Sequence, residues 1–277
     1  MTSDGWTGAV RRRLGLGRLL PLGGPRDGAW LTEAAAEAVL RRAARNVTGV
    51  RLGVLRLELA DPDGPFEPAV PAPPSALPPG PLRVTAECAA AAYEPLPTTT
   101  ARLRSALATT ATQRLGLVVS EIDLRVTELL DTEPESAAGT GARPDAEAGT
   151  GAGARPDMAT GTETGAGPGP GRQPRPGVTP ASVPAPGGAD LAGDEALAAA
   201  AALAVPGVTG TSGVLGRAVR LEERHDSTAA LPRRHVQLEI TAAATPRTLD
   251  VALAVRTAVS AALPDRPTVT VLVTAVD

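Results

Sequence analysis

The sequence of 277 residues contains no lysine, one cysteine and two histidines. Because Cys88 has no second cysteine to pair with, an intrachain disulfide is excluded, and a reducing cytoplasm is the simplest setting. His225 and His235 lack the cysteine or Glu-x-x-His spacing that accompanies them in a zinc site. We therefore predict that the protein holds no metal ion and no cofactor.

Aromatic side chains make up only 1% of the chain. None follows Tyr93, so the second half has to build its core from Val, Leu, Ile and Ala, which bury less area per side chain. Small RNA-binding folds stack bases on aromatic platforms beside a basic groove, and the sequence shows neither feature. The net charge of -3 also argues against a nucleic-acid partner.

Residues 1–29 combine basic and apolar positions. No run reaches the ~18 apolar residues of a membrane span, and Arg18 and Pro21 interrupt the apolar part that a secretory signal needs. We interpret the segment as a flexible basic N-terminal arm. A twin-arginine export signal is one alternative, and contact with a membrane surface along one helix is another. The residues that would make this membrane contact are Trp6, Val10, Arg11, Arg12, Arg13 and Leu14.

Residues 30–130 open with a helical pattern, in which Thr32 is placed to cap the first turn and Glu37 to pair with Arg41. Gly49 follows this pattern, where a glycine in the left-handed conformation would end the helix. After Gly49, apolar and polar residues alternate, which predicts two strands with one solvated face. A second helical pattern and a last alternating strand follow them.

A proline-rich segment, residues 61–81, separates the first two predicted strands. Proline lacks the backbone N–H that a central strand or a helix interior requires, so we predict a long extended loop. Recognition of this segment by a partner that binds proline-rich sequence is the alternative interpretation.

Residues 131–189 are dominated by Gly, Ala, Pro and Thr, and the sequence Gly-Ala-Arg-Pro-Asp occurs at 141–145 and again at 153–157. Because so little apolar surface is available for burial, the conformational entropy lost on ordering this backbone would not be offset. We therefore predict a disordered linker. Residues 190–277 then follow the order of the first domain, and Gly207 is placed to end their first helix.

We therefore predict an α+β protein made of two small repeated domains joined by the linker over 131–189. In each domain the order is helix, strand, strand, helix, strand. The three strands form one sheet, and the two helices cover one of its faces.

Two short motifs recur in both domains. A helix closes on Val-x-Gly-Val at 47–50 and at 205–208, and the last strand alternates apolar residues at 122–126 and at 269–273. This arrangement resembles the alkaline shock protein (Asp/Gls-type) family of envelope stress response proteins, present as two divergent copies. The resemblance implies a cytoplasmic, non-enzymatic protein that is held near the membrane by a small membrane-anchored protein, with self-association as a further contact.

The sequence shows no catalytic constellation. Cys88 falls on the apolar side of a predicted strand, so we expect a buried thiol and not a nucleophile. His225 stands beside Asp226 in a polar segment, and we interpret this pair, like Glu133 and Glu135, as solvated. We predict a non-catalytic scaffold that acts through protein–protein contacts. The alternative is a nucleic-acid-associated regulatory protein that uses the arginine-rich N-terminal arm.

Overall fold

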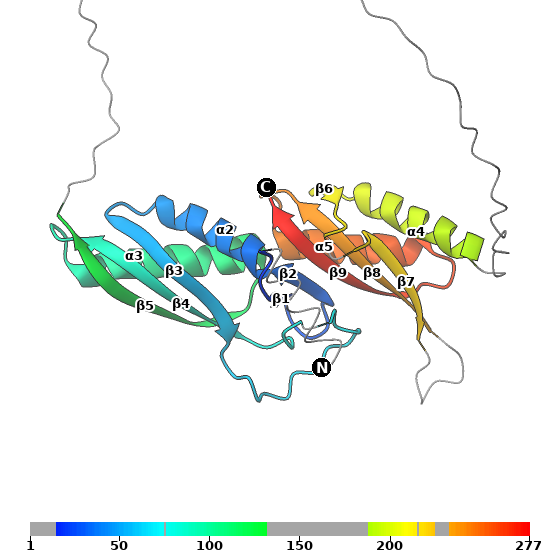
Figure 1. The fold of residues 1–277 in the computed structure, drawn as a ribbon, viewed down its shortest axis with the longest axis horizontal. Coiled ribbons are helices and arrows are strands. Elements are labelled where there is room, and N and C mark those ends of the chain that lie inside the picture. Colours follow the sequence, from blue (N-terminus) through cyan, green and yellow to red (C-terminus); the bar gives the residue numbers. More distant parts are fainter. Residues whose placement is uncertain (1–14, 75, 132–187, 215, 225–232) are drawn as a thin grey trace, which may run out of the picture. The chain divides into compact units, whose positions relative to one another are not determined.

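The computed structural model describes residues 15–74, 76–131, 188–214, 216–224 and 233–277 (Figure 1). In this part of the chain, four α-helices and one π-helix accompany a six-stranded and a three-stranded sheet. The predicted α+β class is confirmed. The disordered linker was predicted over 131–189, and nearly all of that segment lies outside the described residues.

The elements before this gap differ from the prediction by two additional strands. In chain order they are β1 (Leu19–Leu22), β2 (Ala29–Thr32), α2 (Glu33–Arg45), β3 (Val50–Leu59), β4 (Leu82–Ala91), α3 (Leu96–Thr109), the π-helix η1 (Thr110–Leu115) and β5 (Val119–Leu130).

The elements after the gap include one more strand than predicted. They are α4 (Gly188–Leu203), β6 (Val208–Thr211), β7 (Val219–Arg224), β8 (Arg233–Ala242), α5 (Thr248–Ala262) and β9 (Thr268–Val276).

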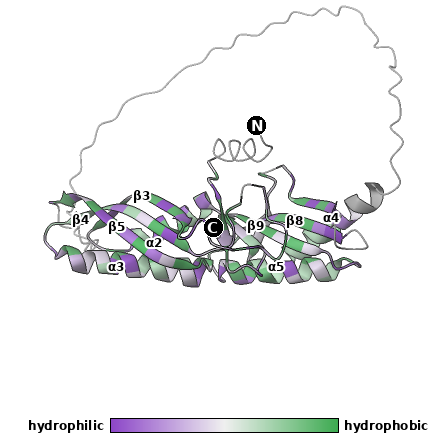
Figure 2. Ribbon diagram, turned by 90° about the horizontal axis from the view of Figure 1, so that it is seen from below, coloured by the Kyte–Doolittle hydropathy of each residue, from purple (hydrophilic) through white to green (hydrophobic). Residues whose placement is uncertain are grey.

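The three-stranded sheet has the order β3-β4-β5, with β3 antiparallel and β5 parallel to β4. The apolar face of this sheet packs against α2 and α3 and forms part of the hydrophobic core. Hydrophilic and hydrophobic residues alternate along these strands (Figure 2), and the opposite face carries exposed ion pairs such as Arg83 with Glu121 at 2.6 Å. The predicted solvated face is confirmed. Water and salt screen exposed pairs of this kind, so they serve solubility more than stability.

The predicted helix boundaries follow from local chemistry. The Thr32 hydroxyl accepts a hydrogen bond from the Ala35 backbone N–H at 3.3 Å, as an N-cap residue does. Gly49 and Gly207 adopt left-handed φ angles of 75° and 93°, which glycine tolerates without a side-chain clash. The predicted cap and the left-handed conformation of both glycines are therefore confirmed, but the helices themselves end earlier, at Arg45 and Leu203, and each glycine directly precedes the next strand.

The second sheet has six strands instead of the predicted three. Its order is β1-β2-β9-β8-β6, and β7 also pairs with β8. The pairing of β2 with β9 is parallel and sets Trp30 opposite Leu272. The prediction of a flexible arm over 1–29 is wrong for both N-terminal strands, because Leu19 and Leu20 are fully buried in the sheet. A run of four residues indicates a strand only when its partner is known: β1 pairs with the equally short β2, and β2 pairs with β9, which is about 240 residues away.

The proline-rich loop between Leu59 and Leu82 is extended, as predicted, and it packs against the six-stranded sheet. The Leu77 backbone N–H donates to the Leu19 carbonyl at 2.9 Å, and the Trp30 indole N–H donates to the Leu77 carbonyl at 3.2 Å. Val70 is buried there in a small apolar cluster with Leu19, Trp30 and Leu272. The loop therefore supplies apolar cover for β1, β2 and β9.

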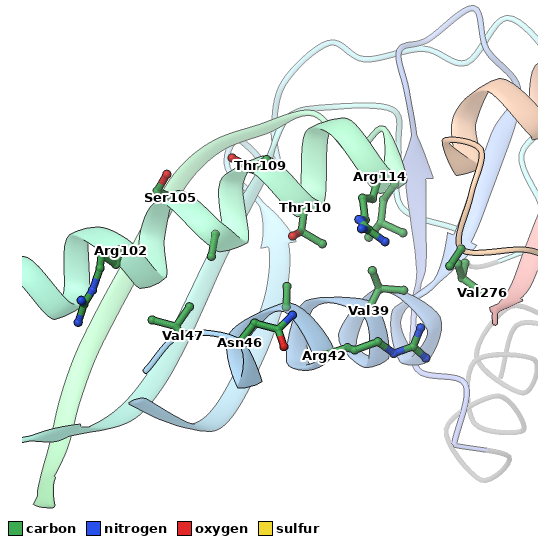
Figure 3. Close-up of a pocket in the computed structure, with 14 residues that line it drawn as sticks. Val39, Arg42, Asn46, Val47, Arg102, Ser105, Thr109, Thr110, Arg114 and Val276 are labelled. Carbon is green, nitrogen blue, oxygen red and sulfur yellow. The ribbon is translucent and has the colours of Figure 1, made fainter. Parts of the chain in front are cut away.

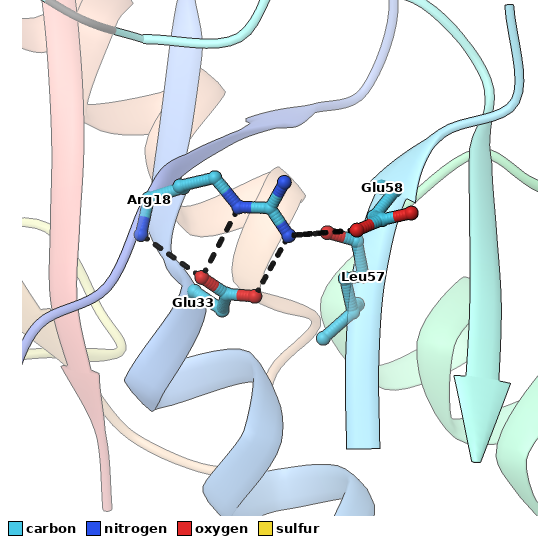
Figure 4. A network of polar contacts seen from close by, with 4 residues as sticks. All are labelled: Arg18, Glu33, Leu57 and Glu58. Carbon is cyan, nitrogen blue, oxygen red and sulfur yellow. Dashed lines mark hydrogen bonds and ion pairs between the residues drawn. The ribbon is translucent and has the colours of Figure 1, made fainter. Parts of the chain in front are cut away.

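Arg18 fastens the segment before β1 to two elements of the first half (Figure 4). Its guanidinium donates to the Glu33 carboxylate at 3.1 Å and to the Leu57 carbonyl at 2.5 Å. The Glu33 backbone N–H donates in return to the Arg18 carbonyl at 2.8 Å. Because Glu33 begins α2 and Leu57 lies in β3, one side chain joins the N-terminal segment, a helix start and a strand.

Trp30→Ala should lower the free energy of unfolding by about 3–5 kcal/mol, because it removes a fully buried indole and its hydrogen bond to the loop. Urea unfolding followed by circular dichroism measures this. Tyr93→Ala is the control: this side chain is 50% exposed, and its loss should cost about 1 kcal/mol or less. Equal losses in the two variants would contradict the packing of the loop on Trp30.

Candidate functional site

A groove with a volume of about 510 Å³ lies between α2 and the continuous helix formed by α3 and η1 (Figure 3). The α2 wall uses positions spaced three and four apart, which places them on one helical face. These residues are Val39, Arg42, Ala43, Asn46 and Val47.

The opposite wall follows the same spacing along α3 and continues into η1. Its residues are Arg102, Ser105, Ala106, Thr109, Thr110, Arg114 and Leu115. Ala244 and Val276 complete the lining at one end.

The π-helix turns Arg114 toward the groove. At about 100° per residue, an uninterrupted α-helix would place Arg114 roughly a third of a turn away from Arg102. The wider turn changes this direction, and the Gly116 backbone N–H donates to the Ala111 carbonyl at 2.9 Å in the i→i+5 pattern. Gly116 then ends the helix with a φ of 91°. Single π turns of this kind are frequent at functional sites.

The groove is cationic at its rim and apolar at its floor. Its lining contains three arginines and no aspartate or glutamate. Arg102 pairs with Glu94, which lies outside the lining. Among the described residues, neither Arg42 nor Arg114 has an ion-pair partner. An arrangement with two uncompensated guanidinium groups beside apolar side chains favours binding of an anionic, partly apolar group.

His235 lies in β8, where it is only 4% exposed. Its Nδ1 is 2.8 Å from the Thr268 hydroxyl. Burial, and secondarily the positive charge of Arg224, lower the pKa of His235 to about 4. The imidazole is therefore neutral at pH 7 and packed as part of the sheet. The predicted pair of His225 and Asp226 lies outside the described residues.

The remaining sequence candidates are placed as follows. Cys88 is 1% exposed in β4, and burial raises the pKa of its thiol, which confirms the predicted buried cysteine. Glu133, Glu135 and the membrane-contact residues of the N-terminal arm lie outside the described part of the chain.

Sequence reasoning missed the groove. The predicted helix before Gly49 was assigned no binding role, and neither Arg42 nor Arg114 was named as a candidate. The missed signal is the spacing of Val39, Arg42, Asn46 and Val47, which mixes apolar and cationic residues on a second helical face. Nothing in the sequence showed that α3 and η1 would form one continuous helix and place Arg114 across from that face.

Comparison of the chain with protein-family models, with curated proteins and with solved structures found no match. Within the described ranges, His, Cys, Asp and Glu side chains form no group of three that could hold a metal ion. None of the described helices combines the length and the apolar character needed to cross a bilayer.

Gly116→Ala should destabilise the protein by about 2 kcal/mol or more, because a Cβ is disfavoured at this φ and would overlap Leu249. Gly193→Ala is the matched control. Gly193 is exposed in α4 with open space around it, so this change should stabilise by about 0.5–1 kcal/mol. Chemical denaturation of both variants measures the difference, and a neutral Gly116→Ala would contradict the tight end of η1.

The buried His235 should make stability depend on pH. With a pKa lowered to about 4 in the folded state, against an ordinary value of 6.5, the unfolded chain binds more protons between these values. The contribution of the neutral His235 to the free energy of unfolding is therefore complete above pH 6.5. It should fall by roughly 2–3 kcal/mol as the pH drops to about 4. Urea unfolding at several pH values measures this loss. In the variant His235→Asn, the free energy of unfolding should depend less steeply on pH between about 4 and 6.5. An unchanged pH dependence would contradict the prediction.

Proposed function

We propose that this chain is a non-catalytic interaction protein and that the groove between α2 and α3 is its docking surface. The single observation that supports this most strongly is a lining with three arginines, no carboxylate and an apolar floor. Arginine is enriched in the centres of protein interfaces because its planar guanidinium binds carboxylates through two parallel hydrogen bonds.

The chemistry of the lining favours binding over catalysis. Ser105, Thr109 and Thr110 supply hydroxyl groups, but the lining contains no histidine, carboxylate or lysine that could take a proton from them. The floor side chains, among them Val39, Val47 and Leu115, offer apolar area for burial. A partner with acidic and aliphatic side chains matches both properties.

We also propose that the two halves are related copies of one unit. In each half a helix connects two parallel, directly paired strands, β4 to β5 and β8 to β9. In each half a glycine with positive φ lies between the first helix and the first strand that follows it. The same order supports the resemblance to alkaline shock proteins of the envelope stress response. On this basis the protein acts at the cytoplasmic side of the membrane, beside a small membrane-anchored partner.

Affinity capture from membrane and soluble fractions tests the proposal. The full-length protein should retain a defined partner, and the variant Arg42→Glu/Arg114→Glu should recover at least tenfold less of it, because the charge of the groove is reversed. Quantitative mass spectrometry measures the recovery.

The matched control is Arg56→Glu/Arg125→Glu. Both of these arginines are exposed on strands of the three-stranded sheet, away from the groove lining, so the variant has the same change in net charge. It should retain the partner at the level of the unchanged protein. Equal recovery by all three proteins, or equal loss in both variants, would refute the groove as the docking surface.

A further inference from the structure

We infer that the groove binds an amphipathic acidic helix of a partner protein, with carboxylates near both ends and aliphatic residues between them. This inference rests on the proposed function and specifies the chemistry of the partner. Three observations lead to it. They are the distance between the arginines of the groove, the helical structure of both walls and the pairing of this chain's own helix carboxylates with arginines.

The arginines are too far apart for one small anion. Arg102 and Arg114 are twelve residues apart on one continuous helix, which corresponds to roughly 18 Å along its axis. Arg42 and Arg114 lie on opposite walls near one end of the groove, and Arg102 lies toward the other end (Figure 3). A phosphate group could contact the first pair but could not also reach Arg102. The occupant is therefore elongated, with one negative group at Arg42 and Arg114 and a second at Arg102, whose guanidinium is 46% exposed and has N–H donors besides the one that bonds Glu94.

The walls of the groove exclude an added strand. Both walls are helices, whose backbone N–H and C=O groups already bond within each helix. An extended peptide would lose hydration of its own backbone here and would find no ladder of partners. A helical occupant satisfies its backbone internally and presents only side chains. Binding of an amphipathic helix in an apolar groove is one of the recurring modes of peptide recognition.

A second copy of this chain offers few suitable carboxylates. Where the structure describes the carboxylate side chains of the helices, each is already paired with an arginine of the same chain. The pairs are Glu33 with Arg18, Glu37 with Arg41, Asp194 with Arg234, Glu195 with Arg217 and Asp250 with Arg247. Because an arginine accompanies each of these carboxylates, these helix faces offer little net negative charge to the unpaired Arg42 and Arg114, which favours a different protein as the partner.

A peptide-display library tests the inference directly. The library has a helix-forming 16-residue scaffold in which end positions and central positions of one face are varied among acidic, basic, polar and aliphatic residues. It is selected on the full-length protein, with counter-selection on Arg42→Glu/Arg114→Glu. We expect enrichment of Asp or Glu at both ends and of Leu, Ile or Val at the centre. Enrichment of basic or uncharged ends, or no enrichment, would overturn the inference.

Fluorescence anisotropy with the most enriched peptide gives the second readout. Its affinity should fall at least tenfold when its carboxylates become amides, and also when the protein carries Arg42→Gln/Arg114→Gln. Arg56→Gln/Arg125→Gln should leave the affinity unchanged. A peptide with lysines at the acidic positions should bind Arg42→Glu/Arg114→Glu better than it binds the unchanged protein, because the charges have been exchanged.

Two further results would assign the groove to another occupant. Displacement of the peptide by millimolar inorganic phosphate would indicate a phosphate site. A dimer in analytical ultracentrifugation that dissociates in Arg42→Glu/Arg114→Glu would indicate self-association. If affinity capture identifies a groove-dependent partner while the library yields no acidic helix, only this inference fails. If both experiments fail, the proposed function fails with it.

Discussion

The parallel pairing of β2 with β9 is the interaction on which the rest of the structure depends. The next residue after β2 begins α2, so the strand that joins the six-stranded sheet also fixes the start of one wall of the groove. Thr32 has a part in both, because its hydroxyl donates to the Thr274 carbonyl at 3.0 Å and accepts from the Ala35 backbone N–H. Since Thr32 is fully buried, loss of this hydroxyl would leave buried polar groups without partners.

Other contacts hold the second wall of the groove to the same framework. The Arg247 guanidinium, at the start of α5, donates to the Thr112 carbonyl of η1 at 3.1 Å. The Gly23 backbone N–H, which follows β1, donates to the Gly116 carbonyl at 3.1 Å. The π turn that directs Arg114 is therefore fastened by segments from both ends of the sequence. The geometry of the groove is a property of the assembled protein and not of two isolated helices.

Local chemistry allowed much of the fold to be predicted. Thr32 as a helix cap, the left-handed conformation of Gly49 and Gly207 and Cys88 as a buried thiol depend on neighbours a few residues away, and the structure confirms each. The pairing of β1 with β2 is local, but the place of both strands in the six-stranded sheet depends on β9, which no pattern near Leu19 or Leu20 shows. The groove was missed for the same reason: Arg42 and Arg114 become a pair only when two distant helices pack together.

The distance in sequence between β2 and β9 has a consequence for how the protein is made. Trp30 leaves the ribosome about 240 residues before its neighbour Leu272. At about 5–20 residues per second, this delay is on the order of 10–50 s. During that time the nascent chain presents the open edge of β2 beside the leucine-rich β1, which is the kind of surface that chaperones bind and that promotes aggregation. The proline-rich loop, which is synthesised soon afterwards, bonds to Leu19 of β1 and packs on Trp30, so it is suited to cover the apolar side chains of the hairpin until the last strand emerges.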